Sequence, residues 1–426
     1  MFAKTSDAGK MRTTIFTVGS RGDVQPYVAL GAALARSGLD VTVATHEPFR
    51  DFVTDRGLAF AALPGDPRAL LATDEAQELL RTGLGLVRFA RRFVAILEPW
   101  FWKLVDAITP IHEKSEAVLY SALAFPTWHL AQVDRTPTIQ LSLQPLLPTS
   151  SFPAITTSFR DIGLLGNRVT HSVNQQLFWQ PLRTAVDRWR TQDLGLPPHG
   201  LRGPYRELAA KGEPIVHGFS RHLVAPPADW PDQALVTGHW PLADDRPLTN
   251  ETAAWLDDGA APVYVGFGSI RDSESERLAD IAITATERAN ARLVLDSGWT
   301  GLEGAADDRV HVVCDTDHTM LFPRMASVVH HGGAGTTHTA AAAGVPSMAV
   351  PYYADQPFWG RRLESAGIGA PPLPRRELDA GQLTERITML GGEALRSRAA
   401  EVGAAMRSER GLQAATEFIL RHLDRA

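Results

Sequence analysis

The run Val328-Val329-His330-His331-Gly332-Gly333-Ala334-Gly335-Thr336-Thr337 contains the strongest indication of the fold and of a ligand site. It predicts a buried strand that ends at two histidines, then a glycine-rich turn and the first residues of a helix. Glycines allow a ligand to approach the backbone closely, and the N–H groups at a helix start attract anions. The run therefore predicts a phosphate-binding loop.

A second motif follows about twenty residues later. Pro351-Tyr352-Tyr353-Ala354-Asp355-Gln356-Pro357-Phe358-Trp359 places a carboxylate and an amide directly after the next expected strand, at residues 347–350. A phosphate-binding loop followed by two side chains able to bind hydroxyl groups is the combination that a nucleotide-sugar site requires.

Both halves of the chain alternate short apolar strands with helices. In the first half, strands are expected at residues 13–18, 39–45 and 58–63, and a helix at 24–37. In the second half, strands are expected at residues 262–267, 292–295, 310–313 and 328–330. This alternation predicts an α/β protein with two doubly wound parallel sheets. A Pro-rich stretch at residues 226–248 is predicted to be the linker between an N-terminal domain (11–225) and a C-terminal domain (249–408).

The composition excludes several classes of protein. The 426 residues suit two domains, and the net charge of −6, without a basic stripe, argues against nucleic-acid binding. Cys314 is the only cysteine, so no internal disulfide or cysteine-rich zinc site is expected. We see neither a signal peptide nor a membrane span, and a cytoplasmic protein without stable membrane insertion is expected.

Five motifs together resemble those of inverting GT-B glycosyltransferases of glycosyltransferase family 1, in its bacterial natural-product and sterol glucosyltransferase-like groups. Two are the glycine-rich loop and the Asp355 segment. The others are Gly19-Ser20-Arg21-Gly22-Asp23-Val24-Gln25-Pro26, Gln144-Pro145-Leu146-Leu147-Pro148-Thr149 with Phe152-Pro153, and Val263-Tyr264-Val265-Gly266-Phe267-Gly268-Ser269. The resemblance implies two Rossmann-like domains facing each other across a cleft. The acceptor would bind the first and the nucleotide sugar the second, and a last helix (409–426) would cross back to the first.

Asp23 is the candidate catalytic base. It lies in a glycine-flanked turn after the first strand, where a side chain can reach a cleft at the carboxyl ends of the strands. Many relatives have His at the matching position. Because a carboxylate is a weak base unless burial raises its pKa, a burial effect is expected. The alternative is that Asp23 only caps the following helix.

The donor diphosphate is expected to contact His330, with His331 as a weaker candidate. Gly333, Ala334, Gly335 and Thr336 should add backbone and hydroxyl donors, and the resemblance and the turn positions add Ser269 and Ser20. This arrangement would offset the leaving-group charge without a metal, and no cofactor is expected.

The resemblance assigns the donor sugar to Asp355 and Gln356, and we place the nucleoside against Trp299 and Val313. Many UDP-sugar enzymes have Glu eight residues after the histidine of the loop, where this chain has His338. Loss of a ribose-binding carboxylate favours a dTDP-deoxysugar over UDP-glucose, although some sterol-type relatives lack that Glu.

The acceptor pocket is predicted from an aromatic-rich part of the N-terminal half and from the resemblance. Its candidates are Phe89, Phe93, Trp100, Gln144 and Phe152. They indicate an apolar aglycone such as a macrolide, polyketide or aromatic compound. Transfer of glucose to a sterol-like lipid, a non-catalytic nucleotide-sugar-binding auxiliary subunit and a GT-B epimerase remain alternatives, and a homodimer stays open.

Overall fold

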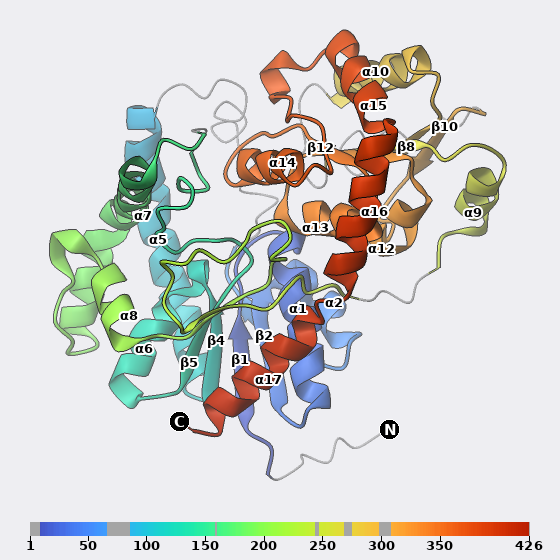
Figure 1. Ribbon diagram of the computed structural model, residues 1–426. Helices are drawn as coiled ribbons and strands as arrows, with labels where there is room; N and C mark the ends of the chain where they lie inside the picture. Colours follow the sequence, from blue (N-terminus) through green and yellow to red (C-terminus); the bar gives the residue numbers. More distant parts are fainter. Residues whose placement is uncertain are drawn as a thin grey trace.

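The computed structural model describes residues 9–65, 86–157, 160–242, 247–267, 275–297 and 308–425, and the side chains of helix α5 (Leu86–His112) only from residue 97. Two parallel sheets form the centres of two domains (Figure 1). The predicted α/β class with two doubly wound domains is confirmed.

The N-terminal sheet has seven strands in the order β3-β2-β1-β4-β5-β6-β7, and all neighbours are parallel. The strands are β1 (Arg12–Phe16), β2 (Asp40–His46), β3 (Ala59–Leu63), β4 (Ala117–Ser121), β5 (Thr138–Ser142), β6 (Ile215–His217) and β7 (Ala234–Val236). The strand order reverses between β1 and β4, so a ligand is expected at their carboxyl ends.

The second sheet has five parallel strands in the order β10-β9-β8-β11-β12. They are β8 (Val263–Gly266), β9 (Leu293–Asp296), β10 (Val310–Val313), β11 (Ser327–His330) and β12 (Ser347–Ala349). Here the order reverses between β8 and β11, which places the end of β11 at the second expected ligand position.

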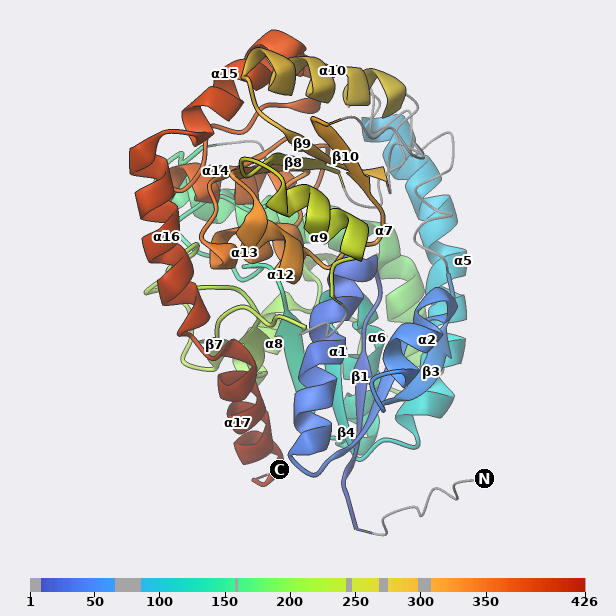
Figure 2. The ribbon, with the colours of Figure 1, turned by 90° about the vertical axis from the view of Figure 1, so that its right-hand side faces the viewer.

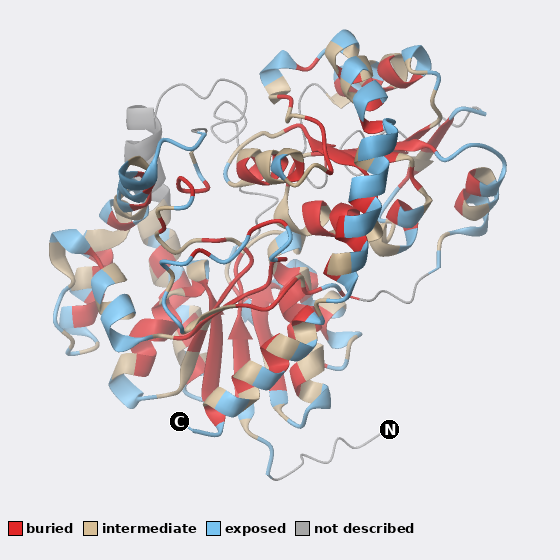
Figure 3. Ribbon diagram, in the orientation of Figure 1, coloured by how far each residue is buried: buried red, intermediate tan, exposed pale blue. Residues whose placement is uncertain are grey.

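Helices cover both faces of each sheet, and the strands between them are buried (Figures 2 and 3). The longer helices of the N-terminal domain are α1 (Arg21–Arg36), α5, α6 (Pro126–Asp134), α7 (Leu164–Gln192) and α8 (Tyr205–Lys211). Those of the second domain are α9 (Asn250–Asp257), α10 (Ser275–Arg288), α13 (Ala334–Ala343), α14 (Gln356–Ser365), α15 (Ala380–Leu390) and α16 (Glu393–Arg407), together with the short α12 (His318–Leu321).

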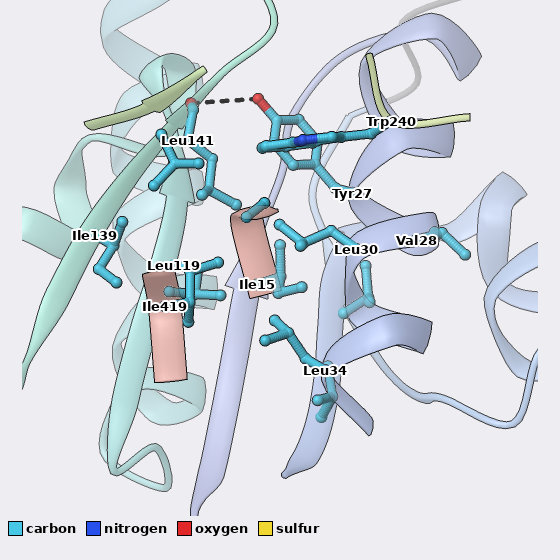
Figure 4. Packing of buried hydrophobic residues seen from close by; sticks show 14 of the residues in the cluster. Ile15, Tyr27, Val28, Leu30, Leu34, Leu119, Ile139, Leu141, Trp240 and Ile419 are labelled. Carbon is cyan, nitrogen blue, oxygen red and sulfur yellow. Dashed lines mark hydrogen bonds between the residues drawn. The ribbon is translucent and has the colours of Figure 1, made fainter. Parts of the chain in front are cut away.

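One face of the N-terminal sheet packs against α1 and the C-terminal helix α17 (Gly411–Leu423). Ile15 and Leu119 of the sheet, Leu30 of α1 and Ile419 of α17 lie in one buried cluster (Figure 4). The hydroxyl of Tyr27 donates a hydrogen bond of 3.3 Å to the Leu141 carbonyl across this cluster. Helix α17 is therefore part of the N-terminal core, although it follows the second domain in sequence.

The linker predicted at residues 226–248 is partly wrong. Residues 234–236 form β7, which pairs with β6 and closes the edge of the N-terminal sheet. A run of prolines before this short strand hides it, because proline disfavours strand interiors. The chain crosses between the domains after β7 and again before α17. The two crossings touch, since a Cβ on Gly411 would lie 2.4 Å from the carbonyl oxygen of His239.

Candidate active site

A cleft of about 1850 Å³ lies between the two domains and is lined by both. It contains ten of the residues predicted from the sequence, contributed by four separate segments: Ser20, Asp23, Gln144, His331, Gly333, Ala334, Gly335, Thr336, Asp355 and Gln356. The parts predicted for acceptor, diphosphate and sugar therefore converge on one space.

Asp23 is held at the start of α1. Ser20 is the N-cap residue, and its backbone N–H and its hydroxyl donate to Oδ2 of Asp23 at 2.9 and 3.1 Å. Helix α1 begins at Arg21, so Ser20 rather than Asp23 is the N-cap residue; Asp23 is the third helical residue, completes the capping box and also lines the cleft. Burial raises the pKa of this carboxyl, and the two bonds from Ser20 lower it in part. The net upward direction is what a proton acceptor near neutral pH requires.

Gly19 makes this arrangement possible. Its φ of 147° is in the region that side chains disfavour, and a Cβ there would lie 2.4 Å from Oδ2 of Asp23. The Gly19 N–H donates to Nε2 of His46 at 3.2 Å. The turn between β1 and α1 is therefore held by the bond from Gly19 to His46 and by the close packing of Asp23 on Gly19.

His330, the last residue of β11, and His331, directly after it, have different environments, and their order as cleft residues is the reverse of the predicted ranking. Contact with a diphosphate stays a prediction for both. His330 is fully buried, does not line the cleft, and accepts a hydrogen bond of 3.0 Å at Nδ1 from the Gly332 N–H. His331 lines the cleft. His330 ends the strand and His331 follows it in extended chain, where neighbouring side chains point to opposite sides, which accounts for the different surroundings of the two rings.

His331 lies directly against Gly333, the N-cap residue of α13. A Cβ on Gly333 would lie 2.4 Å from Nε2 of His331, so this glycine lets the imidazole pack on the loop. Burial lowers the pKa of His331 to about 4, which makes the ring neutral at pH 7. No side chain caps the N-cap Gly333, so the helix dipole and its first N–H groups face the cleft beside this imidazole.

Asp355 and Gln356 begin helix α14. Oε1 of Gln356 accepts hydrogen bonds from the N–H groups of Tyr352 and Tyr353 at 2.7 and 3.2 Å, so this oxygen holds the turn. Oδ2 of Asp355 accepts a bond of 2.8 Å from Nε1 of Trp359. Trp359 is fully buried.

The Asp355 carboxyl has a pKa raised to about 6. Burial is the largest cause, the Trp359 bond lowers the value, and the negative charge of Asp23 raises it further. A side-chain hydrogen bond with Gln144 of the other domain also lowers it. The predicted sugar and acceptor sides are therefore electrostatically connected across the cleft.

His338 is a structural residue here. It does not line the cleft and is 1% exposed; its Nδ1 contacts the Ala334 carbonyl oxygen at 2.7 Å. Its Nε2 accepts a bond of 3.1 Å from the N–H of Ser220, which follows β6 in the other domain. The next residue, Thr339, faces the cleft instead and was missed by sequence reasoning.

Part of the acceptor prediction is wrong. Phe152 is buried against Phe358, with ring centroids 5.5 Å apart, and Trp100 packs on the N-terminal core; neither lines the cleft. Aromatic residues in amphipathic segments usually fill cores, which explains the error. Apolar side chains of Trp128, Phe178, Trp179 and Leu182 line the cleft instead, and none of them is among the five acceptor candidates.

Other predicted residues have no place in the cleft or cannot be placed. The Val313 side chain is buried outside the cleft, and a role for its backbone stays a prediction. Ser269, Trp299 and the side chains of Phe89 and Phe93 lie outside the described residues. Within the described ranges, no three His, Cys, Asp or Glu side chains are grouped to hold a metal ion.

Two family models match the chain. Residues 13–120 match "Glycosyltransferase family 28 N-terminal domain", and residues 293–416 match "Erythromycin biosynthesis protein CIII-like, C-terminal domain". The O-mycaminosyltylonolide 6-deoxyallosyltransferase of Streptomyces fradiae is 35% identical over 96% of this chain and 97% of its own length. The chain belongs to this family of GT-B glycosyltransferases. The predicted GT-B resemblance is thus confirmed, whereas the matched N-terminal model is described as family 28 rather than family 1.

This glycosyltransferase is also similar to sterol enzymes. Sterol 3-beta-glucosyltransferase UGT80A2 of Arabidopsis thaliana is 33% identical over 98% of this chain, which spans 66% of that protein. The chain spans 29% of the sterol 3-beta-glucosyltransferase of Yarrowia lipolytica, at 30% identity.

Solved structures agree on the fold. The glycosyltransferase of kitacinnamycin has a TM-score of 0.69 at 20% identity and covers 97% of this chain and 99% of its own. Glycosyltransferase VinC has a TM-score of 0.68 at 18% identity and covers 98% and 100%. In the described parts of this glycosyltransferase, no helix is long and apolar enough to span a membrane.

Proposed function

We propose that this glycosyltransferase moves a sugar, with inversion, from a nucleotide diphosphate donor to a hydroxyl of an apolar acceptor. One observation carries the proposal. Asp23 at the carboxyl end of β1 lines the same cleft as His331, the start of α13 and Asp355, which come from the other domain. A proton acceptor and an anion-binding loop on opposite walls are the two parts that such a displacement needs.

In the proposed step, Asp23 takes the proton of the acceptor hydroxyl. At the same time, the oxygen of that hydroxyl forms a bond to the anomeric carbon of the donor sugar. The bond from that carbon to the diphosphate oxygen breaks, and the nucleoside diphosphate leaves with the electron pair. The two hydrogen bonds from Ser20 orient the Asp23 carboxylate through Oδ2. Burial raises its pKa and so strengthens it as a base.

The leaving diphosphate would be stabilised by the N–H groups at the start of α13, the hydroxyl of Thr336 and a ring N–H of the neutral His331. Such preoriented donors stabilise charge that develops in the transition state. We propose that no metal or other cofactor takes part in this step.

For the donor, we propose a dTDP-deoxysugar, and for the acceptor a macrolide, polyketide or aromatic aglycone. The deoxyallosyltransferase relative, which this chain matches over nearly its full length, supports this choice. The absence of a carboxylate at position 338 was the argument from sequence, but His338 is buried outside the cleft, so the choice of donor rests on this relative.

UDP-glucose with a sterol-like acceptor is the second candidate, and a specific observation favours it. Asp296, Asp315 and Asp317 line the donor side of the cleft and could accept hydrogen bonds from ribose hydroxyls. The Arabidopsis sterol relative supports this alternative as well.

Mass-spectrometric turnover assays with dTDP-deoxysugars and UDP-glucose, each with macrolide and sterol acceptors, test both proposals. Product only from dTDP donors supports the first, and product only from UDP-glucose the second. Asp23→Asn should abolish product while dTDP or UDP binding is kept. Asp51→Asn, at an exposed carboxylate of the same domain, is the matched control. Full turnover by Asp23→Asn would exclude this residue as the base.

A further inference from the structure

The first half of α7 presents an apolar row to solvent. Leu165, Val169, Val173 and Leu177 are spaced four residues apart and are 81%, 60%, 52% and 60% exposed. Residues at this spacing lie on one face of a helix. Ile162 precedes the row and is 49% exposed. A helix normally turns such a row toward the core, so this apolar row has no partner within the described chain.

The exposed row does not result from a helix that lacks a core side. The opposite side of α7 is buried through Thr170 and His171. The Thr170 hydroxyl accepts a bond of 2.8 Å from the Ala154 N–H, and Nε2 of His171 contacts the Phe152 carbonyl oxygen at 3.0 Å. Helix α7 is therefore anchored in the domain, and the apolar row is an additional face.

Along α7 itself, positive charge predominates beside the apolar row. Residues 162–186 contain no Asp or Glu, whereas Arg168 and Arg183 lie within this stretch and Arg160 precedes it. The nearest carboxylate, Asp161, accepts hydrogen bonds from the Gly163 N–H and Nδ2 of Asn167 and so is used at the helix start. An apolar face flanked by arginines is complementary to an anionic lipid surface.

We propose that the apolar row of α7 docks on an anionic membrane surface. Leu165, Val169, Val173 and Leu177 enter the interface between headgroups and acyl chains, and Arg168 and Arg183 pair with lipid phosphates. The row is about 18 Å long, which suits a helix lying in the membrane plane rather than crossing it. The proposal does not depend on which sugar is transferred or on the role of Asp23.

The position of α7 links this surface to the cleft. Arg168, Ser172 and Phe178 of the same helix line the cleft on its acceptor side. Figure 1 shows α7 beside α5 on the flank of the N-terminal domain, next to the space between the domains. Docking through the apolar row would bring the acceptor side of the cleft to the membrane, where apolar acceptors accumulate.

Co-sedimentation with vesicles tests the proposal on the full chain. The probes are vesicles of phosphatidylcholine alone and of phosphatidylcholine with phosphatidylglycerol. We expect the protein to bind the anionic vesicles. This binding should weaken at about 0.5 M NaCl, because salt screens the attraction between the arginines and the lipid phosphates. The triple variant Val169→Gln, Val173→Gln, Leu177→Gln should lower the partition coefficient by about 100-fold, because three apolar side chains no longer leave water.

A matched control changes exposed apolar residues elsewhere. Val133, Met320 and Met389 are 53%, 46% and 44% exposed, and their replacement by Gln should leave vesicle binding unchanged. The α7 triple variant should keep its thermal midpoint and its turnover of a water-soluble acceptor, since none of its three positions lines the cleft.

Three results would overturn the proposal. The wild type could fail to bind anionic vesicles, or the α7 variant could bind them as well as the wild type does. Light scattering could also show a wild-type dimer that the α7 variant converts to a monomer, which would make the row an interface between copies. None of these outcomes bears on donor specificity, so the proposed function is tested separately.

Discussion

The guanidinium of Arg21 and the carboxylate of Asp315 form an ion pair of 2.7 Å across the mouth of the cleft. Arg21 is the first residue of α1, two residues before Asp23 in the same helical turn, and Asp315 follows β10 in the other domain. The side chains are 37% and 61% exposed. This pair therefore joins the two domains next to the proposed base, in contact with solvent.

Arg21→Gln should change the free energy of unfolding by less than about 1 kcal/mol, because an exposed ion pair contributes little in water. Its effect should appear in donor KM, since Asp315 is left without this partner at the cleft. The same substitution at Arg12, whose ion pair with Glu116 lies away from the cleft, is the control. A loss of stability well above that limit would contradict this assignment.

Asp23→Asn should lower kcat by about 100- to 10,000-fold, the range for loss of a general base. Asparagine can still accept hydrogen bonds from Ser20, so the start of α1 should persist and donor affinity should be kept. Steady-state kinetics and calorimetric titration with the nucleotide measure the two effects. A loss of nucleotide affinity equal to the loss of kcat would show that Asp23 acts only in shaping the site.

Gly333→Ala should weaken nucleotide binding by displacing the ring of His331, which a Cβ would approach to 2.4 Å. Because both changes act on one imidazole, Gly333→Ala and His331→Ala should be non-additive in a double-mutant cycle. Additive losses, measured by titration with nucleoside diphosphate, would mean that the glycine has a separate role. A Cβ on Gly335 meets no atom within 4 Å, so Gly335→Ala controls for the fold of the loop.

Donor affinity should rise with pH around pH 6 if ionised Asp355 binds sugar hydroxyls. Burial and the charge of Asp23 raise the Asp355 pKa to about 6, so this carboxyl is protonated below that pH and charged above it. Asp355→Asn should remove the pH dependence and lower affinity at pH 8. Titrations with the sugar nucleotide and with the nucleotide alone separate sugar binding from diphosphate binding; an equal pH dependence for both would contradict the assignment.

His338→Leu should destabilise the protein by about 1–3 kcal/mol, because the buried Ser220 N–H loses its acceptor. Burial lowers the His338 pKa to about 4, below its unfolded value, so the unfolded chain binds the extra proton between these pH values. The stability contributed by His338 is therefore present at pH 7 and lost as pH falls from about 6.5 toward 4. Urea unfolding measures the free energy of unfolding at pH 7 and at pH 5, and the difference between the two values should be smaller for His338→Leu than for the wild type. Thr339→Ala provides the control.

The fold was predictable because its signals are local. Strands such as β8 and β11 are short apolar runs ending in glycine or histidine, and their alternation with helices implies parallel sheets. Strand β7 was not predictable, since only its pairing with β6 distinguishes three residues among prolines from a linker.

The site was predictable where contact follows from backbone position. Gly333, Ala334 and Gly335 lie at a helix start, and their backbone lines the cleft independently of any side-chain conformation. Which of His330 and His331 lines the cleft depends on how the end of β11 faces the other domain. Whether Phe152 lines the cleft depends on its packing against α14. Both depend on tertiary contacts, which cannot be inferred from a single sequence.

The two crossings between the domains have a consequence for engineering. Because α17 completes the N-terminal core after the chain has left the second domain, the second domain is an insertion within the N-terminal domain. In a chimaera made with a single junction, the N-terminal sheet of one parent would pack against helix α17 of the other parent. Exchange of donor specificity between relatives should therefore replace an internal cassette, with one junction near residue 242 and the second before Gly411, so that each hydrophobic core is inherited whole.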